Sequence, residues 1–170
     1  MAPLRGGFVF KSENFVDNGI PIVRISNILP SGNVGGTFVF YASQLNGENY
    51  LLPNGAALLA MSGATTGKVS ILEYGAEITK IYQSQRVGYF VNSGIADYSS
   101  VSTVVRSHLF ITKLNSVLVT GAQPNVSPKE IDSFEFYFPK ASDEQSKVGS
   151  FFTHLGHLIT LHQREQEHDL

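Results

Sequence analysis

The sequence contains no cysteine and no tryptophan, and only 15% of its 170 residues are charged. The lack of cysteine excludes a disulfide framework and Cys-based zinc or thiol chemistry, and it suits a reducing cytoplasm. No apolar run approaches the roughly 20 residues of a membrane span, and the N-terminus lacks a signal-peptide core. A net charge of −2 excludes a strongly basic nucleic-acid binder. The 42% of hydrophobic residues exclude a wholly disordered chain and predict one globular domain, alone or with an appendage.

The charge is unevenly distributed along the chain. Residues 1–129 carry nine Lys and Arg against six Asp and Glu, a net charge of +3. Residues 130–170 carry three bases against eight acids, a net charge of −5. This asymmetry indicates two surfaces with different partners. Drift in composition along the chain explains the asymmetry equally well, so the charge distribution alone does not decide between the two interpretations.

Short apolar and β-branched segments separated by turns predict strands in the first part of the chain. These segments are residues 20–25, 37–41, 57–61, 68–72, 80–82 and 86–91. Gly63 and Gly67 allow a sharp turn in the small-residue loop that joins the third segment to the fourth. Between residues 98 and 118 the apolar positions follow helical spacing instead, which predicts one or two helices.

Two later segments carry clear local signals. Ser127, Pro128 and Glu130 form the pattern of a helix start, with Ser127 as the N-cap and Glu130 closing a capping box. Apolar and polar residues then alternate from Phe134 to Phe138, which predicts a strand that ends at Pro139.

A second capping box, Ser142 with Gln145, predicts the start of a long helix. Apart from Gly149 and Gly156, nothing interrupts it from residue 143 to 168, a length of about 39 Å. Its apolar positions recur at steps of four and three, which is a heptad pattern. We expect this stripe to pack against another long helix, from a second copy or a second half of the protein, although docking along its own domain is the alternative. The predicted interface residues are Val148, Phe151, Phe152, Leu155, Leu158, Ile159 and His162.

The sequence contains no motif that clearly indicates catalysis. The segment from Gly63 to Lys68 has three residues between its glycines and Val69 after the lysine, so it is a turn rather than a phosphate loop. His154 and His157 share a helix face without a third ligand, which favours a solvated polar face over a metal site. No Ser/His/Asp arrangement, paired acidic motif or dinucleotide fingerprint is present. The sequence predicts a protein without a catalytic, metal or cofactor site; a hydrolase using His108 or a helix histidine is the remote alternative.

What remains is a set of polar residues at predicted strand ends, of the types that contact DNA. Arginine reads guanine, Asn and Gln read adenine, and Thr and Lys bind phosphates. Taken singly, each is also an ordinary loop residue. The candidate DNA-binding residues are Arg24, Asn27, Thr65, Thr66, Lys68, Gln83, Gln85, Arg86, Gln123 and Asn125, with Arg24, Lys68 and Arg86 the strongest.

Four segments, in order, resemble the specificity subunit of type I restriction–modification enzymes. Residues 19–28 resemble the opening of its target recognition domain, and residues 59–68 resemble its Gly-rich turn. Residues 123–127 with Phe138-Pro139 resemble the exit from that domain. Glu144-Gln145 and residues 158–164 resemble the start and the body of the long helix that follows it.

The resemblance implies an α+β target recognition domain over residues 1–141, with small mixed or antiparallel sheets and short helices. It implies a long spacer and dimerisation helix over residues 142–170, which forms an antiparallel, coiled-coil-like pair. Such a subunit is non-catalytic: it reads half of a bipartite site in double-stranded DNA and docks methyltransferase subunits. The family usually has two domains and two helices, so we expect a half-length subunit or a fragment. A dimeric binding or scaffold module without a DNA role is the alternative.

Overall fold

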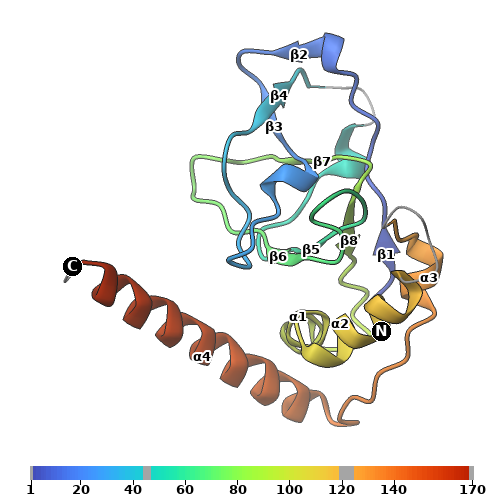
Figure 1. Ribbon diagram of the computed structural model, residues 1–170, viewed down its shortest axis with the longest axis vertical. Coiled ribbons are helices and arrows are strands. Elements are labelled where there is room, and N and C mark those ends of the chain that lie inside the picture. Colours follow the sequence, from blue (N-terminus) through green and yellow to red (C-terminus); the bar gives the residue numbers. More distant parts are fainter. Residues whose placement is uncertain (1, 44–46, 119–124, 169–170) are drawn as a thin grey trace.

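The computed structural model describes residues 2–43, 47–118 and 125–168, and its strands form two small sheets (Figure 1). The first sheet is antiparallel throughout, and the second is mixed because β3 and β7 run parallel. This confirms the predicted fold class. The first sheet has the order β1 (Leu4–Arg5), β8 (Val87–Phe90), β5 (Ala57–Ala60), β6 (Val69–Ile71), and the second β2 (Phe15–Val16), β4 (Val39–Tyr41), β3 (Ile20–Val23), β7 (Tyr82–Gln83).

The helices lie mainly at the end of the molecule opposite the second sheet, where they pack against the first sheet (Figure 1). The predicted helical region is confirmed as two helices, and the capped turn after residue 127 is confirmed as a third. The helices are α1 (Tyr98–Val105), α2 (His108–Leu118), α3 (Pro128–Asp132) and α4 (Ser142–His168), and short 3-10 turns are η1 (Ser12–Asn14), η2 (Ile25–Asn27) and η3 (Gly47–Tyr50).

Strand β5 is buried on both faces, which explains its uninterrupted apolar sequence. Its side chains alternate across the sheet. Ala57 and Leu59 join a core with Phe90, from β8, and with α1, α2 and α3. Leu58 and Ala60 join a second core on the opposite face. The first sheet is therefore the central layer, and the site described below lies where its strands end.

Helix α1 is attached to this sheet through Tyr98. The Tyr98 hydroxyl donates to the carbonyl oxygen of Phe90 at 2.7 Å and accepts from the backbone nitrogen of Ala57 at 3.0 Å. Burial raises the pKa of this hydroxyl. The two hydrogen bonds bridge β5 and β8, so they hold the helix layer in register with the sheet.

Helix α4 starts by packing on α1, and Gln145 fixes the contact. Its Oε1 accepts from the backbone nitrogen of Asp97 at 2.7 Å, and its Nε2 donates to the carbonyl oxygen of Pro139 at 2.7 Å. The predicted capping box at Ser142 is therefore wrong, because Gln145 uses its side chain to join two other segments. Gly149 is buried against Ser99, so its small size serves a close approach within the chain.

The predicted strand from Phe134 to Phe138 is also wrong. The segment is extended but belongs to no sheet. Phe134, Phe136 and Phe138 pack on the core beside α2, whereas Tyr137 is fully exposed. Alternating hydrophobicity shows which side chains face the core, but a strand also needs a neighbouring strand for its backbone groups.

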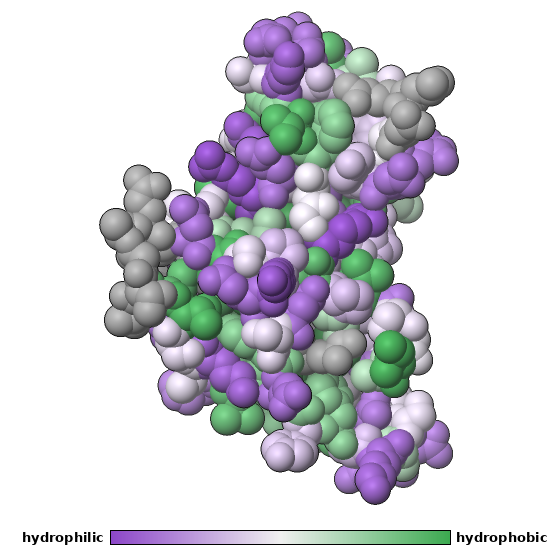
Figure 2. All heavy atoms as spheres, turned by 90° about the vertical axis from the view of Figure 1, so that its right-hand side faces the viewer, coloured by the Kyte–Doolittle hydropathy of each residue, from purple (hydrophilic) through white to green (hydrophobic). Residues whose placement is uncertain are grey.

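Beyond its contact with α1, α4 keeps its apolar stripe exposed. The face of the molecule in Figure 2 mixes hydrophilic and hydrophobic side chains. On α4, in contrast, exposed apolar side chains follow one another along the helix. Among the described residues, no helix is both long and apolar enough to cross a membrane. The exposed side chains are Val148 (39%), Phe151 (64%), Phe152 (45%), Leu155 (41%), Leu158 (64%), Ile159 (51%) and Leu161 (56%).

Asp97 caps α1, and we expect its contribution to depend on pH. The hydroxyl of Ser99 and the backbone nitrogens of Ser100 and Ser99 donate to its carboxylate, which lowers its pKa from the ordinary 3.8 against a smaller opposing effect of burial. A lowered pKa means that the stabilisation is fully present above pH 3.8 and is lost as the pH falls through the folded-state value.

We therefore expect Asp97→Ala to lower the free energy of unfolding by about 1 kcal/mol at pH 7. Asp97→Asn keeps a capping acceptor but does not titrate, so its stability deficit relative to the wild type should shrink as the pH falls from 5 to 2. Urea unfolding across this range measures both. A deficit that grows in acid would contradict the assignment.

Candidate nucleic-acid interface

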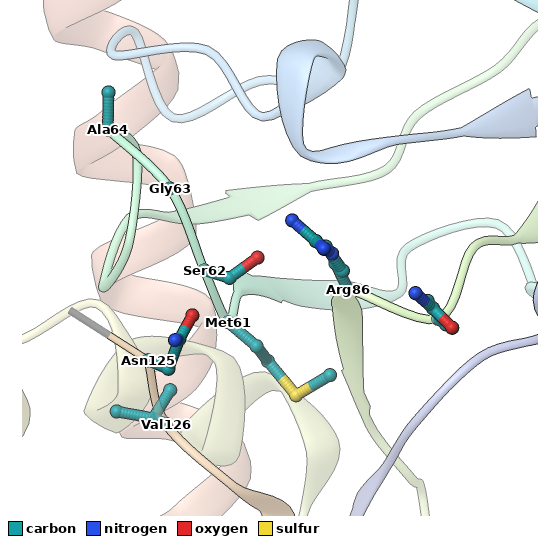
Figure 3. A pocket seen from close by; sticks show the side chains of 8 residues that line it. Met61, Ser62, Gly63, Ala64, Arg86, Asn125 and Val126 are labelled. Atoms are coloured by element: carbon teal, nitrogen blue, oxygen red, sulfur yellow. The ribbon is translucent and has the colours of Figure 1, made fainter. Parts of the chain in front are cut away.

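A cleft of about 660 Å³ opens where the ends of β5 and β8 meet the segment that leads into α3 (Figure 3). The loop after β5, the turn before β8 and the residues before α3 each supply one wall. Three of the predicted DNA-binding residues, Gln85, Arg86 and Asn125, therefore meet in one place although 40 residues of sequence separate them. The cleft is lined by Met61, Ser62, Gly63, Ala64, Gln85, Arg86, Asn125 and Val126.

Backbone hydrogen bonds hold the walls of the cleft together. The nitrogen of Met61 donates to the carbonyl oxygen of Arg86 at 3.0 Å, and the nitrogen of Val126 donates to the carbonyl oxygen of Met61 at 2.9 Å. Ser62 and Asn125 also pair as an isolated bridge. Residue 61 thus joins both neighbouring segments, so the positions of Arg86 and Asn125 are fixed relative to each other.

The turn from residue 62 to 67 joins β5 to β6, as the sequence predicts. Gly63 and Gly67 have φ of 80° and 89°, a conformation that side chains disfavour. A Cβ on Gly63 would lie 3.2 Å from Ile25, and one on Gly67 would lie 2.8 Å from Leu114. Glycine is required at both ends because the turn must reverse sharply while it packs against η2 and α2.

The cleft has a positive electrostatic character. Among the residues that the structure describes, no carboxylate lines it. Within the described part of the chain, the exposed side chains of Gln85 and Arg86 form no hydrogen bond or ion pair. Arg24 lies in a smaller adjoining pocket that has Gln85 and Arg86 in common with the cleft. Two guanidinium groups without acidic partners therefore lie close together, and this arrangement attracts an anion or a base edge rich in acceptors.

Two buried polar atoms beside the cleft have no hydrogen-bond partner among the described residues. They are Ser62 Oγ, in a side chain that is 8% exposed, and Arg24 Nε. An unsatisfied buried polar group costs roughly 1–3 kcal/mol, so such groups point to a binding partner or a water. Ser62 was not predicted as a site residue; its one sequence signal is its place between a buried strand and a sharp glycine turn.

Two of the predicted DNA-binding residues are part of the core instead. Asn27 is 1% exposed; its Nδ2 donates to the carbonyl oxygens of Gly35 and Thr37, and its Oδ1 accepts from the backbone of Arg24. Gln83 is 0% exposed: its Oε1 accepts from the Arg5 guanidinium, and its Nε2 donates to the carbonyl oxygens of Arg5 and Val87. Their amides organise the loops that carry the cleft and are not available to DNA.

The burial of Gln83 is coupled to that of Arg5. The Arg5 guanidinium donates to Gln83 Oε1 and to the carbonyl oxygen of Leu51 at 3.0 Å, and it lies 5.0 Å from the ring centre of Tyr89. Burial lowers the pKa of this guanidinium. The pair thus connects β1, β7 and β8 beneath the cleft.

None of the remaining predicted residues that the structure describes lines the cleft. The Thr65 hydroxyl donates to the carbonyl oxygen of Ile25 at 3.4 Å, and the Thr66 hydroxyl donates to that of Gly63 at 2.6 Å, so both stabilise the turn. Lys68 lines a different groove, towards α2. The structure does not bring Lys68 together with Arg24 and Arg86. Gln123 lies outside the described residues.

The family model of the type I restriction modification DNA specificity domain matches residues 1–168. The chain belongs to this family. The resemblance of the four sequence segments is confirmed, and the α+β domain is a target recognition domain of a type I restriction–modification specificity subunit. Specificity subunits are in general non-catalytic.

Solved structures show the same fold. A chain from a study of complex assembly and conformational transition of the type I R-M system superposes with a TM-score of 0.69 at 10% identity. The crystal structure of the HsdS subunit from Thermoanaerobacter tengcongensis superposes with a TM-score of 0.61, also at 10% identity.

These alignments cover 98% and 96% of this chain but only 38% and 37% of the other chains. The specificity-domain chain therefore spans less than two fifths of the solved proteins that it resembles. No curated protein matches it.

Proposed function

We propose that this specificity domain reads one half of a bipartite sequence in double-stranded DNA through the cleft, and that it catalyses no reaction itself. The observation that supports this most strongly is the meeting of Gln85, Arg86 and Asn125 in one cleft where no carboxylate of the described residues forms part of the lining. Its polar side chains are those that distinguish bases in the major groove. The rigid backbone around them positions these side chains before DNA arrives.

Each residue has a distinct role in this proposal. Arg86 donates to the O6 and N7 atoms of a guanine, and Arg24 extends the positive surface beside it. Gln85 and Asn125 are suited to adenine, because an amide donates to N7 and accepts from N6. The body of the chain, residues 1–129, carries a net charge of only +3, so we expect modest affinity that falls with salt.

The exposed stripe of α4 supports a second part of the proposal. We infer that it packs antiparallel against the same helix of a second copy or of a second half, and that the pair docks methyltransferase subunits. The stripe runs from Val148 to Leu161 and finds no cover within the described part of the chain. An exposed apolar stripe of this length marks an interaction surface.

The replacement Arg86→Ala tests the DNA proposal. It removes a bidentate contact worth about 1–3 kcal/mol, so the Kd for duplexes selected by the wild-type chain from a random pool should rise by a factor of about 5 to 150. Fluorescence anisotropy at 50 mM and 150 mM salt measures the affinity and its salt dependence.

The control is Lys129→Ala, which removes the same charge from the exposed surface of α3. It should change Kd by less than twofold. The slope of log Kd against log salt concentration should fall by no more than the contribution of one phosphate contact. If both variants bind as the wild type does, the cleft is not the DNA interface. If the wild type selects no duplex at low salt, the domain is a scaffold without a DNA role.

A further inference from the structure

A small pocket of about 190 Å³ adjoins the cleft and shares Gln85 and Arg86 with it. One of its walls is apolar and is formed by Phe8, Val9, Phe10 and Phe15. Arg24 supplies its polar side. We call this the aromatic pocket. The apolar wall comes from residues 8–15, which precede β3 and supplied none of the predicted DNA-binding residues.

The apolar wall is held in place before any ligand binds. The rings of Phe8 and Phe10 meet edge to face at 5.0 Å, and Phe10 lies 4.9 Å from Tyr41 and 5.2 Å from Tyr82. The backbone nitrogen of Phe8 donates to the carbonyl oxygen of Gln83 at 3.0 Å. Val9 is the exception: its side chain is 57% exposed and is free to contact a ligand.

The polar side of the pocket presents a donor. Arg24 is half-buried: its Nε is a buried atom, and neither Nε nor the two terminal nitrogens of its guanidinium form a hydrogen bond or ion pair with the described residues, which leaves the terminal nitrogens as the donors that a ligand can reach. Isoleucines 22 and 25 flank it. A ligand that satisfies this site must place an acceptor against Arg24 and an apolar group against the phenylalanines and Val9.

The DNA backbone does not meet these requirements. A phosphate would pair with Arg24 and Arg86, but it has no apolar group to place against the phenylalanine wall, where its remaining oxygens would lose their solvation. Among the four bases, adenine and guanine offer only polar atoms in the major groove, and cytosine presents an amino donor that would face the Arg24 donor. Thymine alone has the O4 acceptor next to a methyl group.

We propose that the aromatic pocket is a thymine-reading subsite, in which the 5-methyl group contacts Val9 and the phenylalanine wall while O4 accepts from Arg24. This inference rests on the proposed DNA function and deepens it: one position of the target half-site is a thymine. The neighbouring bases are contacted by Gln85, Arg86 and Asn125, which line the cleft.

Replacing single thymines with deoxyuridine tests the subsite, because the change removes only the methyl group and leaves O4 and the base pairing intact. The full chain first selects duplexes from a random pool, and each thymine of the selected half-site is then replaced in turn. At one position we expect the Kd to rise about fourfold, the effect of one buried methyl group.

The variant Val9→Ser removes part of the apolar wall, so it should bind thymine and deoxyuridine duplexes equally at that position. Val16→Ser is the matched control, because Val16 is also exposed (38%) but does not line the pocket. It should retain the fourfold preference. In Arg24→Ala, a repeated selection should lose its preference for thymine at the same position.

The outcomes separate the two proposals. Duplexes that bind tightly but tolerate deoxyuridine at every position, or a Val9→Ser variant that keeps the wild-type preference, would overturn the thymine subsite and leave the DNA function standing. A wild-type chain that selects no duplex would overturn the DNA function and the subsite together.

Discussion

Gly149→Ala is expected to destabilise the fold, whereas Gly156→Ala, seven residues further along α4, is expected to stabilise it. A Cβ on Gly149 would overlap Ser99 Oγ and would lie 2.6 Å from the backbone nitrogen of Ser100. Because part of this obstacle is backbone at the start of α1, a change of side-chain rotamer cannot relieve it. A Cβ on Gly156 would meet no atom of the described residues within 4 Å, the backbone of α4 itself apart.

The magnitudes follow from two opposing effects. Alanine gains about 1 kcal/mol over glycine in a helix interior at either position. At residue 149 overpacking costs about 1–3 kcal/mol or more, and the displaced helix also strains the hydrogen bonds of Gln145 to Asp97 and Pro139. We expect a net loss of about 1–3 kcal/mol for Gly149→Ala and a gain approaching 1 kcal/mol for Gly156→Ala.

Thermal unfolding followed by circular dichroism checks both changes, since 1 kcal/mol shifts Tm by about 2–4 °C for a chain of this size. The two variants serve as controls for each other, because they make the same substitution in the same helix. Equal effects at residues 149 and 156 would mean that α4 does not dock on α1. The opposite signs would show that the helix is anchored only at its start.

Phe152→Asp is expected to abolish self-association through α4. Phe152 is 45% exposed in the isolated chain and lies at the middle of the apolar stripe, edge to face with Phe151 at 5.5 Å. A central aromatic residue contributes at least about 2 kcal/mol to an interface, and an unpaired carboxylate in its place adds a desolvation penalty. The dimer dissociation constant should rise at least about 30-fold. Ile159→Asp should act in the same way.

Sedimentation equilibrium at micromolar concentration distinguishes the states, and His154→Asp is the control. His154 is exposed on the polar face of α4, where its ring contacts the carbonyl oxygen of Ser150, so a carboxylate there should leave the dimer intact. The helix content of the Phe152→Asp, Ile159→Asp and His154→Asp variants should be the same. A wild-type chain that sediments as a monomer would contradict the pairing of α4 with a second copy.

The candidate site shows where reasoning from the sequence succeeds. Arg86, Gln85 and Asn125 are polar residues in or beside predicted loops at strand ends, and the structure gathers them in one cleft with Arg24 beside it. Asn27 and Gln83 belong to the same residue types in similar positions, yet both are buried. A single polar residue at a strand end does not show in the sequence whether it faces DNA or its own backbone.

The partners of these buried amides explain the difference. Gln83 is satisfied by Arg5, which is 78 residues away along the chain, and Asn27 by loop carbonyl groups 8 and 10 residues away. Val9 and Phe10 were missed for the opposite reason: they are apolar, and only their position beside Arg24 makes them candidates for base contact.

By itself, the sequence determined the short strands β3 to β8, the paired helices of residues 98–118, the capped turn at Ser127 and the long final helix. These features depend on propensity, periodicity and capping, which act between residues close in the chain. Only the tertiary structure decided that Phe134–Phe138 has no strand partner, that Gly149 faces α1, and which polar side chains line a cleft. Burial and hydrogen-bond satisfaction are set by contacts between distant segments, so no local pattern encodes them.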